Sequence, residues 1–191
     1  SAGDGPFDWV LGVFYTDAEL DRLFTSPFVP PAPAAVTKSE SISVFGEVSY
    51  TFDNNVTVLA GLRYFEDDRS IEDPGLPEVN DTFDSVNPRF NVSYTPTDNA
   101  LYFFDAAKGF RSGLFNSAST CATQLFINPQ LPCETSIDSD EVWTYEFGTK
   151  QTFADRGIVF EASLYYSDWS DAVVAVRPGG AVAAYTIGQV E

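Results

Sequence analysis

The chain has 191 residues, enough for one sizeable domain, and a formal net charge of −18 from 28 acidic and 10 basic residues. This acidity argues against nucleic acid as a partner, because phosphate binding needs a basic surface. Aromatic residues make up 15% of the chain, too large a share for an acidic disordered segment. No apolar run approaches the ~18 residues of a spanning helix, whereas a spanning strand needs only about 9–11 alternating residues.

Alternation of apolar and polar residues predicts eight β-strands. In the first run the odd-numbered residues are apolar, and in the second and third runs the even-numbered residues are. The alternation continues in later runs, and the last run is weaker than the others. The eight runs are Phe7–Tyr15, Ile42–Phe52, Val56–Phe65, Pro88–Thr95, Ala100–Arg111, Trp143–Phe153, Ile158–Trp169 and residues 181–191.

The connections between these runs alternate in length. Residues 53–55, 96–99 and 154–157 form short connections. The long ones are residues 16–39, 66–82 and 112–139, and only the short 177–180 breaks the rule. Aromatic residues also gather near both ends of the strands on the apolar face. Tight turns at one end, long loops at the other and two aromatic girdles are typical of outer-membrane barrels.

We therefore predict an all-β fold, an antiparallel meander of about eight strands that is part of a transmembrane β-barrel. Its apolar face would meet lipid, and its polar face would line a wet lumen. Charges on the polar face would contact a substrate or an interior domain, or compensate one another. The alternative is a soluble β-sandwich binding module, in which the apolar faces pack together. The predicted lumen charges are Glu47, Arg63, Arg89, Asp105, Glu146, Lys150 and Glu161.

Four segments carry a resemblance to a known family. They read VFGEVSYTFDNNVTVLAGLRYFEDDR, FDSVNPRFNVSYTPTDNALYFFDAAKGFRSGLFN, DEVWTYEFGTKQTF and VFEASLYYSDWSDAVV. In this order they resemble the barrel of TonB-dependent outer-membrane receptors of Gram-negative bacteria. The resemblance implies a barrel of about 22 strands with an N-terminal plug in its lumen. It also implies uptake of scarce nutrients such as ferric siderophores, cobalamin, metals or glycans, with energy delivered through TonB.

Against this pattern, residues 1–191 are expected to be a fragment of the barrel, without plug domain, TonB-contacting segment or C-terminal strand. The implied partners are outer-membrane lipid and the plug and remaining strands of the same receptor. TonB would be reached only through the missing N-terminal part. No resident cofactor is expected, and the substrate is not specified. A second alternative is a small eight-stranded outer-membrane barrel that acts as an adhesin or structural protein.

The two cysteines, Cys121 and Cys133, lie in one long loop. Since the resemblance places the chain beside an oxidising compartment, a disulfide is expected. A metal site made of two cysteines has little support in a chain without histidine.

The remaining polar groups allow more than one reading. The acidic segment 66–84 holds eight carboxylates and predicts either a calcium site or a solvated surface. Lys108 and Arg111 lie at the long-loop end of their strand. Lys108 shares the apolar side and would either reach lipid phosphates or be solvated. No nucleophile–base pair, phosphate loop or zinc spacing is present, so an enzyme is not expected.

Two geometric predictions follow from the faces and turns. A turn over residues 154–157 places Lys150 opposite Glu161 on the polar side. The same register pairs Tyr145 with Tyr166 and Phe147 with Leu164 on the apolar side. The whole sheet is predicted to be open, with its first and last runs apart, because a narrow closed barrel would desolvate the inward charges.

Overall fold

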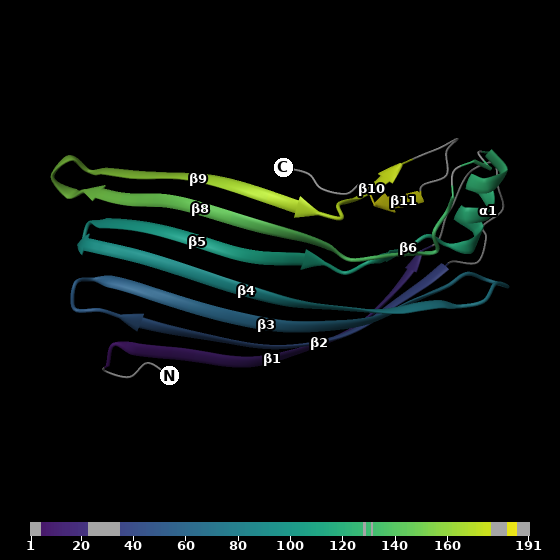
Figure 1. Cartoon of the computed structure of the whole chain (residues 1–191), viewed down its shortest axis with the longest axis horizontal. Helices are drawn as coiled ribbons and strands as arrows, with labels where there is room; N and C mark the ends of the chain where they lie inside the picture. Colours follow the sequence, from purple (N-terminus) through teal and green to yellow (C-terminus); the bar gives the residue numbers. More distant parts are fainter. Residues whose placement is uncertain (1–4, 23–34, 128, 131, 177–182, 187–191) are drawn as a thin grey trace.

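A computed structural model of the chain describes residues 5–22, 35–127, 129–130, 132–176 and 183–186. Seven long strands lie side by side in one antiparallel sheet, in the order β1-β2-β3-β4-β5-β8-β9 (Figure 1). Apart from short pairs at one end, each long strand pairs with its neighbours along the chain. The long strands are β1 Phe7–Arg22, β2 Ala35–Thr51, β3 Val56–Glu72, β4 Val79–Thr97, β5 Ala100–Arg111, β8 Asp140–Phe153 and β9 Ile158–Ser170.

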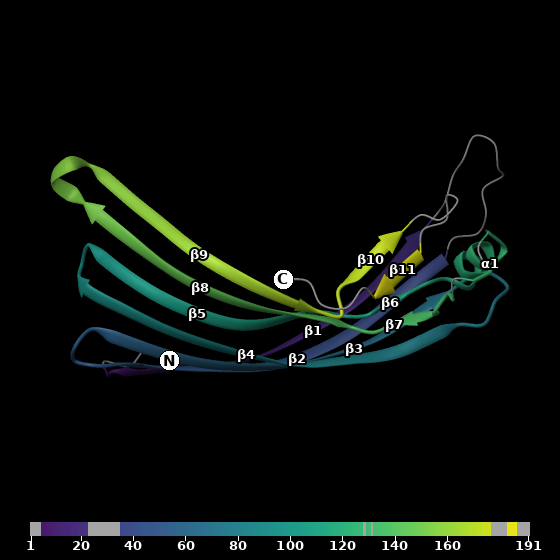
Figure 2. The same ribbon diagram turned by 45° about the horizontal axis from the view of Figure 1, so that its top comes forward.

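The sheet is curved, with a convex and a concave face (Figure 2). Large apolar side chains stand exposed on the convex face, among them Leu11 at 69% and Leu164 at 77%. The described strands form this sheet and two separate two-stranded pairs, so no second large sheet covers that face. The soluble β-sandwich is therefore wrong for the described part of the chain.

The left-hand end of the sheet in Figure 1 carries the tight turns. β2 and β3 are joined through Asn55, whose φ of 61° lies in the left-handed region. β8 and β9 are joined by a short 3₁₀ turn, Ala154–Arg156, followed by Gly157. Gly157 has a φ of 61°, which glycine adopts without the steric cost of a side chain. The predicted short connections are confirmed at this end.

At the other end the strands are longer than predicted. β3 continues to Glu72 and β4 begins at Val79, so most of the expected long connection 66–82 is strand. β1 likewise reaches Arg22 and β2 begins at Ala35. Strands of 16–19 residues exceed the ~9–11 that a membrane needs, so this end of the sheet extends beyond the apolar belt. The extension was missed because polar residues predominate on both of its faces, with Ile71 and Phe83 as exceptions, and alternation no longer marks a strand.

Segment 112–139 folds back over this extended end instead of forming an open loop. It contains β6 Leu114–Phe115, helix α1 Ala118–Ile127 and β7 Ser136–Ile137. In Figure 2 these elements lie at the right, above the ends of β3 and β4. The helix was not predicted from the sequence. Among the described residues no helix has both the length and the apolar character needed to cross a membrane.

Side-chain contacts attach this segment, which we call the cap, to the sheet. The Arg69 Nη1 donates to the Gly113 carbonyl at 2.5 Å, and the Ser136 hydroxyl donates to Asp81 at 2.6 Å. The Phe83 and Phe115 ring centroids lie 6.0 Å apart. Most of the buried apolar side chains of the described chain gather around these contacts. The buried apolar residues are Ile71, Phe83, Cys121, Ile137 and Ala172.

The described part of the eighth predicted run does not join the main sheet. Its described part, β11 Ala183–Thr186, pairs with β10 Val173–Val176 in a separate hairpin. The other residues of that run lie outside the described ranges. The predicted meander is thus correct for seven strands and wrong for the eighth. The open sheet is confirmed for the described residues, and the small closed barrel of eight strands is not formed by them.

The predicted disulfide is present, with the Cys121 and Cys133 sulfurs 2.09 Å apart. It links α1 to the chain that precedes β7. We expect the native protein to gain the mass of two hydrogens on reduction. Replacing both cysteines by serine removes a loop constraint of about 3 kcal/mol in the chain-entropy model. Limited proteolysis with mass mapping should then show new cleavage inside residues 112–139, while the long strands stay resistant. Two freely alkylated thiols in native protein would contradict the assignment.

Candidate functional site

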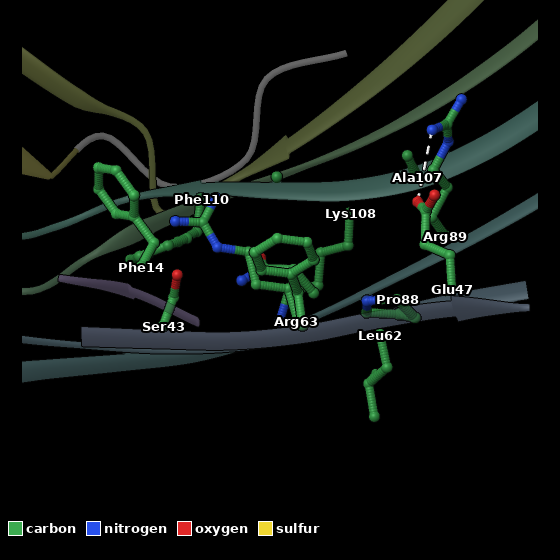
Figure 3. Close-up of a pocket in the computed structure, with 14 residues that line it drawn as sticks. Phe14, Ser43, Glu47, Leu62, Arg63, Pro88, Arg89, Ala107, Lys108 and Phe110 are labelled. Carbon is green, nitrogen blue, oxygen red and sulfur yellow. Dashed lines mark ion pairs between the residues drawn. The ribbon is translucent and has the colours of Figure 1, made fainter. Parts of the chain in front are cut away.

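The concave face carries the charges that the sequence assigned to the polar side. Figure 3 shows Glu47, Arg63 and Arg89 on one side of the sheet and the apolar Leu62 on the other. Adjacent residues point to opposite faces because side chains alternate along a strand. Glu47, Gly61, Arg89 and Ala107 are cross-strand neighbours in one row over four strands. Glu47 and Arg89 therefore lie in the same cross-strand row.

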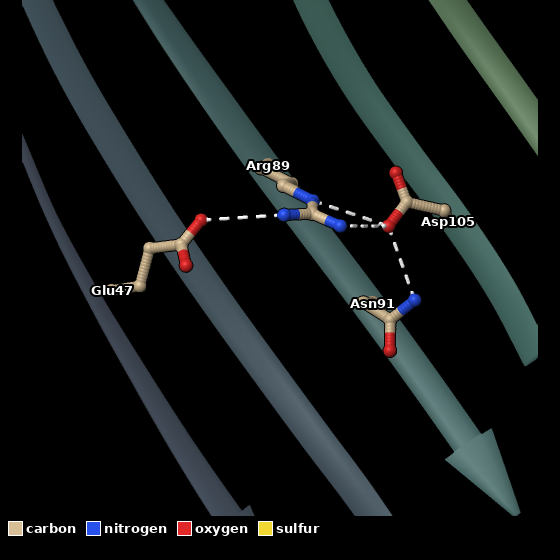
Figure 4. Close-up of polar contacts among 4 residues, drawn as sticks. All are labelled: Glu47, Arg89, Asn91 and Asp105. Carbon is tan, nitrogen blue, oxygen red and sulfur yellow. Dashed lines mark hydrogen bonds and ion pairs between the residues drawn. The ribbon is translucent and has the colours of Figure 1, made fainter. Parts of the chain in front are cut away.

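Arg89 is the centre of a polar cluster that spans β2, β4 and β5 (Figure 4). Its Nε and Nη2 both donate to Asp105 Oδ2, at 3.2 and 3.1 Å. Asn91 Nδ2 donates to the same oxygen at 3.1 Å. On the other side, Arg89 Nη1 lies 3.5 Å from Glu47 Oε1. One cation thus joins two carboxylates that are three strands apart.

Gly61 allows the Glu47–Arg89 contact, although β3 runs between the two residues. A Cβ atom at Gly61 would lie 2.8 Å from Glu47 Cγ and 3.1 Å from its Oε1. Without that atom, the Glu47 side chain lies across β3 and reaches the next strand. Neighbouring strands are about 4.8 Å apart, so a direct contact over two strands needs such a gap.

The β8–β9 hairpin has the predicted register. Lys150 is opposite Glu161, and its Nζ lies 3.7 Å from Glu161 Oε1. Tyr145 pairs with Tyr166, and Phe147 with Leu164, as expected. Both members of the ion pair are more than half exposed, so it contributes at most about 1 kcal/mol.

Arg63 and Glu146 do not join the Arg89 cluster. The Arg63 guanidinium carbon lies 5.1 Å from the centroid of the Phe65 ring. Glu146 is directly opposite Asp105 in the β5–β8 ladder, although like charges in that position repel. Asp105 directs one carboxylate oxygen toward Arg89 and Asn91, which offsets this repulsion.

The other candidate residues have structural partners. Lys108 Nζ lies 2.5 Å from Glu141 Oε1, and its side chain is 15% exposed, so neither predicted environment of Lys108 is correct. Arg111 pairs with Asp140, a carboxylate that is only 2% exposed. Asp140 also accepts the Val173 N–H at 3.2 Å and so holds β10 against the sheet. Sequence reasoning missed Asp140, whose only signal was its position at the start of a strand.

The acidic segment 66–84 belongs largely to the paired ends of β3 and β4. Its carboxylates are separated along two strands, and several accept hydrogen bonds from the sheet itself. Ser39 donates to Asp67 at 2.6 Å, and Thr82 donates to Asp68 at 2.5 Å. In the described part of the chain no three metal-ligating side chains are grouped to hold an ion.

The charged side chains of the concave face, in contrast, are suited to electrostatic contact with a partner.

A substitution at Gly61 tests the cluster. In Gly61→Ala the new methyl group must displace Glu47, so the ion pair with Arg89 is lost at a cost of about 0.2–1 kcal/mol. Urea unfolding of the detergent-solubilised protein measures this change. Gly46→Ala is the matched control, because its Cβ would meet Leu11 at an ordinary 3.4 Å. In a Glu47→Gln background the Gly61→Ala cost should shrink, and an unchanged cost would refute the proposed role of Gly61.

Comparison with known proteins gives the same architecture. A family model described as "TonB dependent receptor-like, beta-barrel" matches residues 1–191. The ferric yersiniabactin uptake receptor FyuA of Yersinia pestis aligns with a TM-score of 0.64 and 19% identity over 91% of this chain and 27% of that one. The ferric preacinetobactin receptor BauA of Acinetobacter baumannii aligns with a TM-score of 0.63 and 15% identity, over 96% and 29% of the two chains.

The alcaligin outer-membrane receptor FauA of Bordetella pertussis gives a TM-score of 0.58 and 12% identity, over 94% of this chain and 34% of that one. The chain thus spans about a quarter to a third of the length of these receptors. At such identities the structures show a shared fold, and the family model carries the assignment. Members of this family are transport receptors of the Gram-negative outer membrane, and not enzymes. The chain belongs to the β-barrel family of TonB-dependent receptors.

Proposed function

We propose that the chain forms part of the barrel wall and extracellular loops of a TonB-dependent receptor that imports a scarce nutrient. The observation that carries this proposal is the open curved sheet, apolar on its convex face and charged on its concave face. Such a sheet is stable in a membrane only as part of a closed wall, with lipid outside and a polar interior. The family match over the whole chain supports the same function.

On this proposal residues 1–191 are a segment of the barrel, and the plug and other strands belong to the rest of the receptor. The length comparison supports it, because the solved receptors are about three to four times longer. The strands that complete the barrel would pair with the outer edges of β1 and β9. TonB would contact the receptor through its N-terminal part, outside this barrel segment. We propose no catalytic role for the segment.

The concave charges are then lumen charges, and we propose that they contact the plug. The charge of Arg89 is largely balanced by its two carboxylate partners. Such a surface suits a folded domain that must bind to it and dissociate again. Arg63 and Glu146 complete the set, together with the Lys150–Glu161 pair. This partial balance of charge supports reversible contact, because solvent-exposed charge pairs at an interface contribute little to its affinity.

The substrate class that we propose first is a ferric siderophore. The three aligned receptors supply the support, since their names describe ferric yersiniabactin uptake, ferric preacinetobactin and alcaligin. Cobalamin, free metals and glycans are the other family substrates. Cells lacking the receptor gene should lose uptake of radiolabelled iron from one siderophore and regain it with the complete gene. Deletion of tonB should abolish the regained uptake. Unchanged uptake of every siderophore in the gene deletion would refute this substrate class.

The lipid-facing side is tested by a pair of adjacent substitutions. Leu164, 77% exposed on the convex face about midway along β9, would carry a charge into the hydrocarbon in Leu164→Arg. We expect the complete receptor to lose about 2–4 kcal/mol of folding free energy in lipid bilayers. Ser163→Arg, one residue earlier on the concave face, is the matched control and should cost much less. Equal losses at both positions would contradict the assigned faces.

A further inference from the structure

The concave face contains a pocket of about 610 Å³ near the row of inward charges (Figure 3). Phe14, Phe45 and Phe110 are among its lining residues, with Arg63 and Ser43. The volume lies within the ~300–1,000 Å³ typical of small-molecule sites, which combine apolar walls with a few polar groups. Glu47 and Arg89 also line the pocket, and Figure 3 shows their ion pair at the right of the view, away from Ser43 and Phe14.

Arg63 brings a positive charge to the pocket that no described carboxylate neutralises. Its contact with the Phe65 ring, at 5.1 Å, holds the guanidinium over an aromatic face. No described carboxylate lies within ion-pair distance of it. Arg89 is different, because Glu47 and Asp105 flank it. Of these two arginines, only Arg63 has no described carboxylate within ion-pair distance, so it remains able to pair with an anion.

Ser43 supplies a second, independent observation. Its side chain is only 1% exposed, and its Oγ has no hydrogen-bond partner among the described residues. Its cross-strand neighbours are Phe14 and Phe65, neither of which can accept or donate a conventional hydrogen bond. In Figure 3 the hydroxyl points to the same side of the sheet as Arg63. A buried hydroxyl without a partner is rare in folded proteins, and this one remains able to bond to a group from outside the described residues.

We propose that this pocket binds a carboxylate group attached to an apolar body. The planar guanidinium of Arg63 matches a carboxylate, and the Ser43 hydroxyl donates to one of its oxygens. The phenylalanine rings pack against the apolar body. Phe14, the cross-strand neighbour of Ser43, is 56% exposed, so its ring has room to change rotamer when the group binds.

The carboxylate has two possible sources with the same chemistry. One is an acidic side chain of the receptor itself, packed into the lumen against this wall. The other is a carboxylate on an imported compound. The inference rests on the proposed function in one respect, namely that the concave face is the lumen side. Binding by the purified receptor needs neither TonB nor transport, so the two proposals fail separately.

The test uses the complete receptor in detergent and titrates it with 3-phenylpropionate, with neutral 3-phenylpropanamide as the comparison. If the site is open to imported compounds, the acid should bind at least tenfold more tightly than the amide. Arg63→Gln should remove that preference, Arg63→Lys should keep part of it, and Ser43→Ala should weaken binding severalfold. Arg156→Gln, which removes a cation in the distant β8–β9 turn, should change nothing.

If the receptor's own carboxylate fills the pocket, the wild-type protein should not bind the acid. Hydrogen exchange should then show that Arg63→Gln, but not Arg156→Gln, loosens an acidic segment outside these 191 residues. The proposal is overturned if the acid does not bind and exchange is unchanged by Arg63→Gln. Equal affinities for acid and amide would overturn it as well. Unchanged iron uptake in cells lacking the receptor gene, with intact acid binding by the purified receptor, would leave this site standing and refute only the proposed substrate class.

Discussion

The structure depends on one constraint, that every backbone N–H and C=O group in hydrocarbon must bond to a neighbouring strand. Six ladders meet it here, and the β1–β2 ladder runs without interruption from Phe7↔Tyr50 to Arg22↔Ala35. Once the ladders are fixed, the pleat assigns each residue to one face. Leu62 and Arg63 are neighbours in sequence yet meet opposite environments. A shift of one residue in register would place the lumen charges in lipid, which is why the register is so strongly specified.

The sequence predicts the spanning parts of the strands well because two different environments act on the two faces there. Apolar and polar residues alternate along each strand because of that difference. The turn at Gly157 then fixes the register that pairs Lys150 with Glu161. Beyond the apolar belt no lipid meets the convex face, so polar residues occur on both faces and the alternation is lost. Asp17, Glu40 and Asp68 are cross-strand neighbours in that region, and nothing in their polarity indicates a strand. The strands continue there only through backbone hydrogen bonds to their neighbours, and these bonds cannot be inferred from the sequence of one strand.

The cap and the concave cluster were harder to predict, for a related reason. Both depend on contacts between residues far apart in the chain. Arg69 meets the Gly113 carbonyl, and Arg111 pairs with the buried Asp140, so that the ends of β3 and β5 are tied to later segments. The sequence identified Glu47, Arg89 and Asp105 as inward charges. It did not indicate which of them meet, because that depends on Gly61 leaving space over the intervening strand.

The open edges of the sheet connect these observations to the proposed receptor. Each edge of β1 and β9 that faces away from the sheet is unpaired among the described strands. Unpaired edges of long strands invite pairing with other chains, and in hydrocarbon they would also leave polar groups unsatisfied. Both strands carry highly exposed convex side chains, Val13 at 67% and Leu164 at 77%, so their edges lie within the apolar belt. Further strands must therefore cover them in the membrane. A wall that curves gently over seven strands, with charges that need room on its concave side, is completed by a wide barrel more readily than by a narrow one.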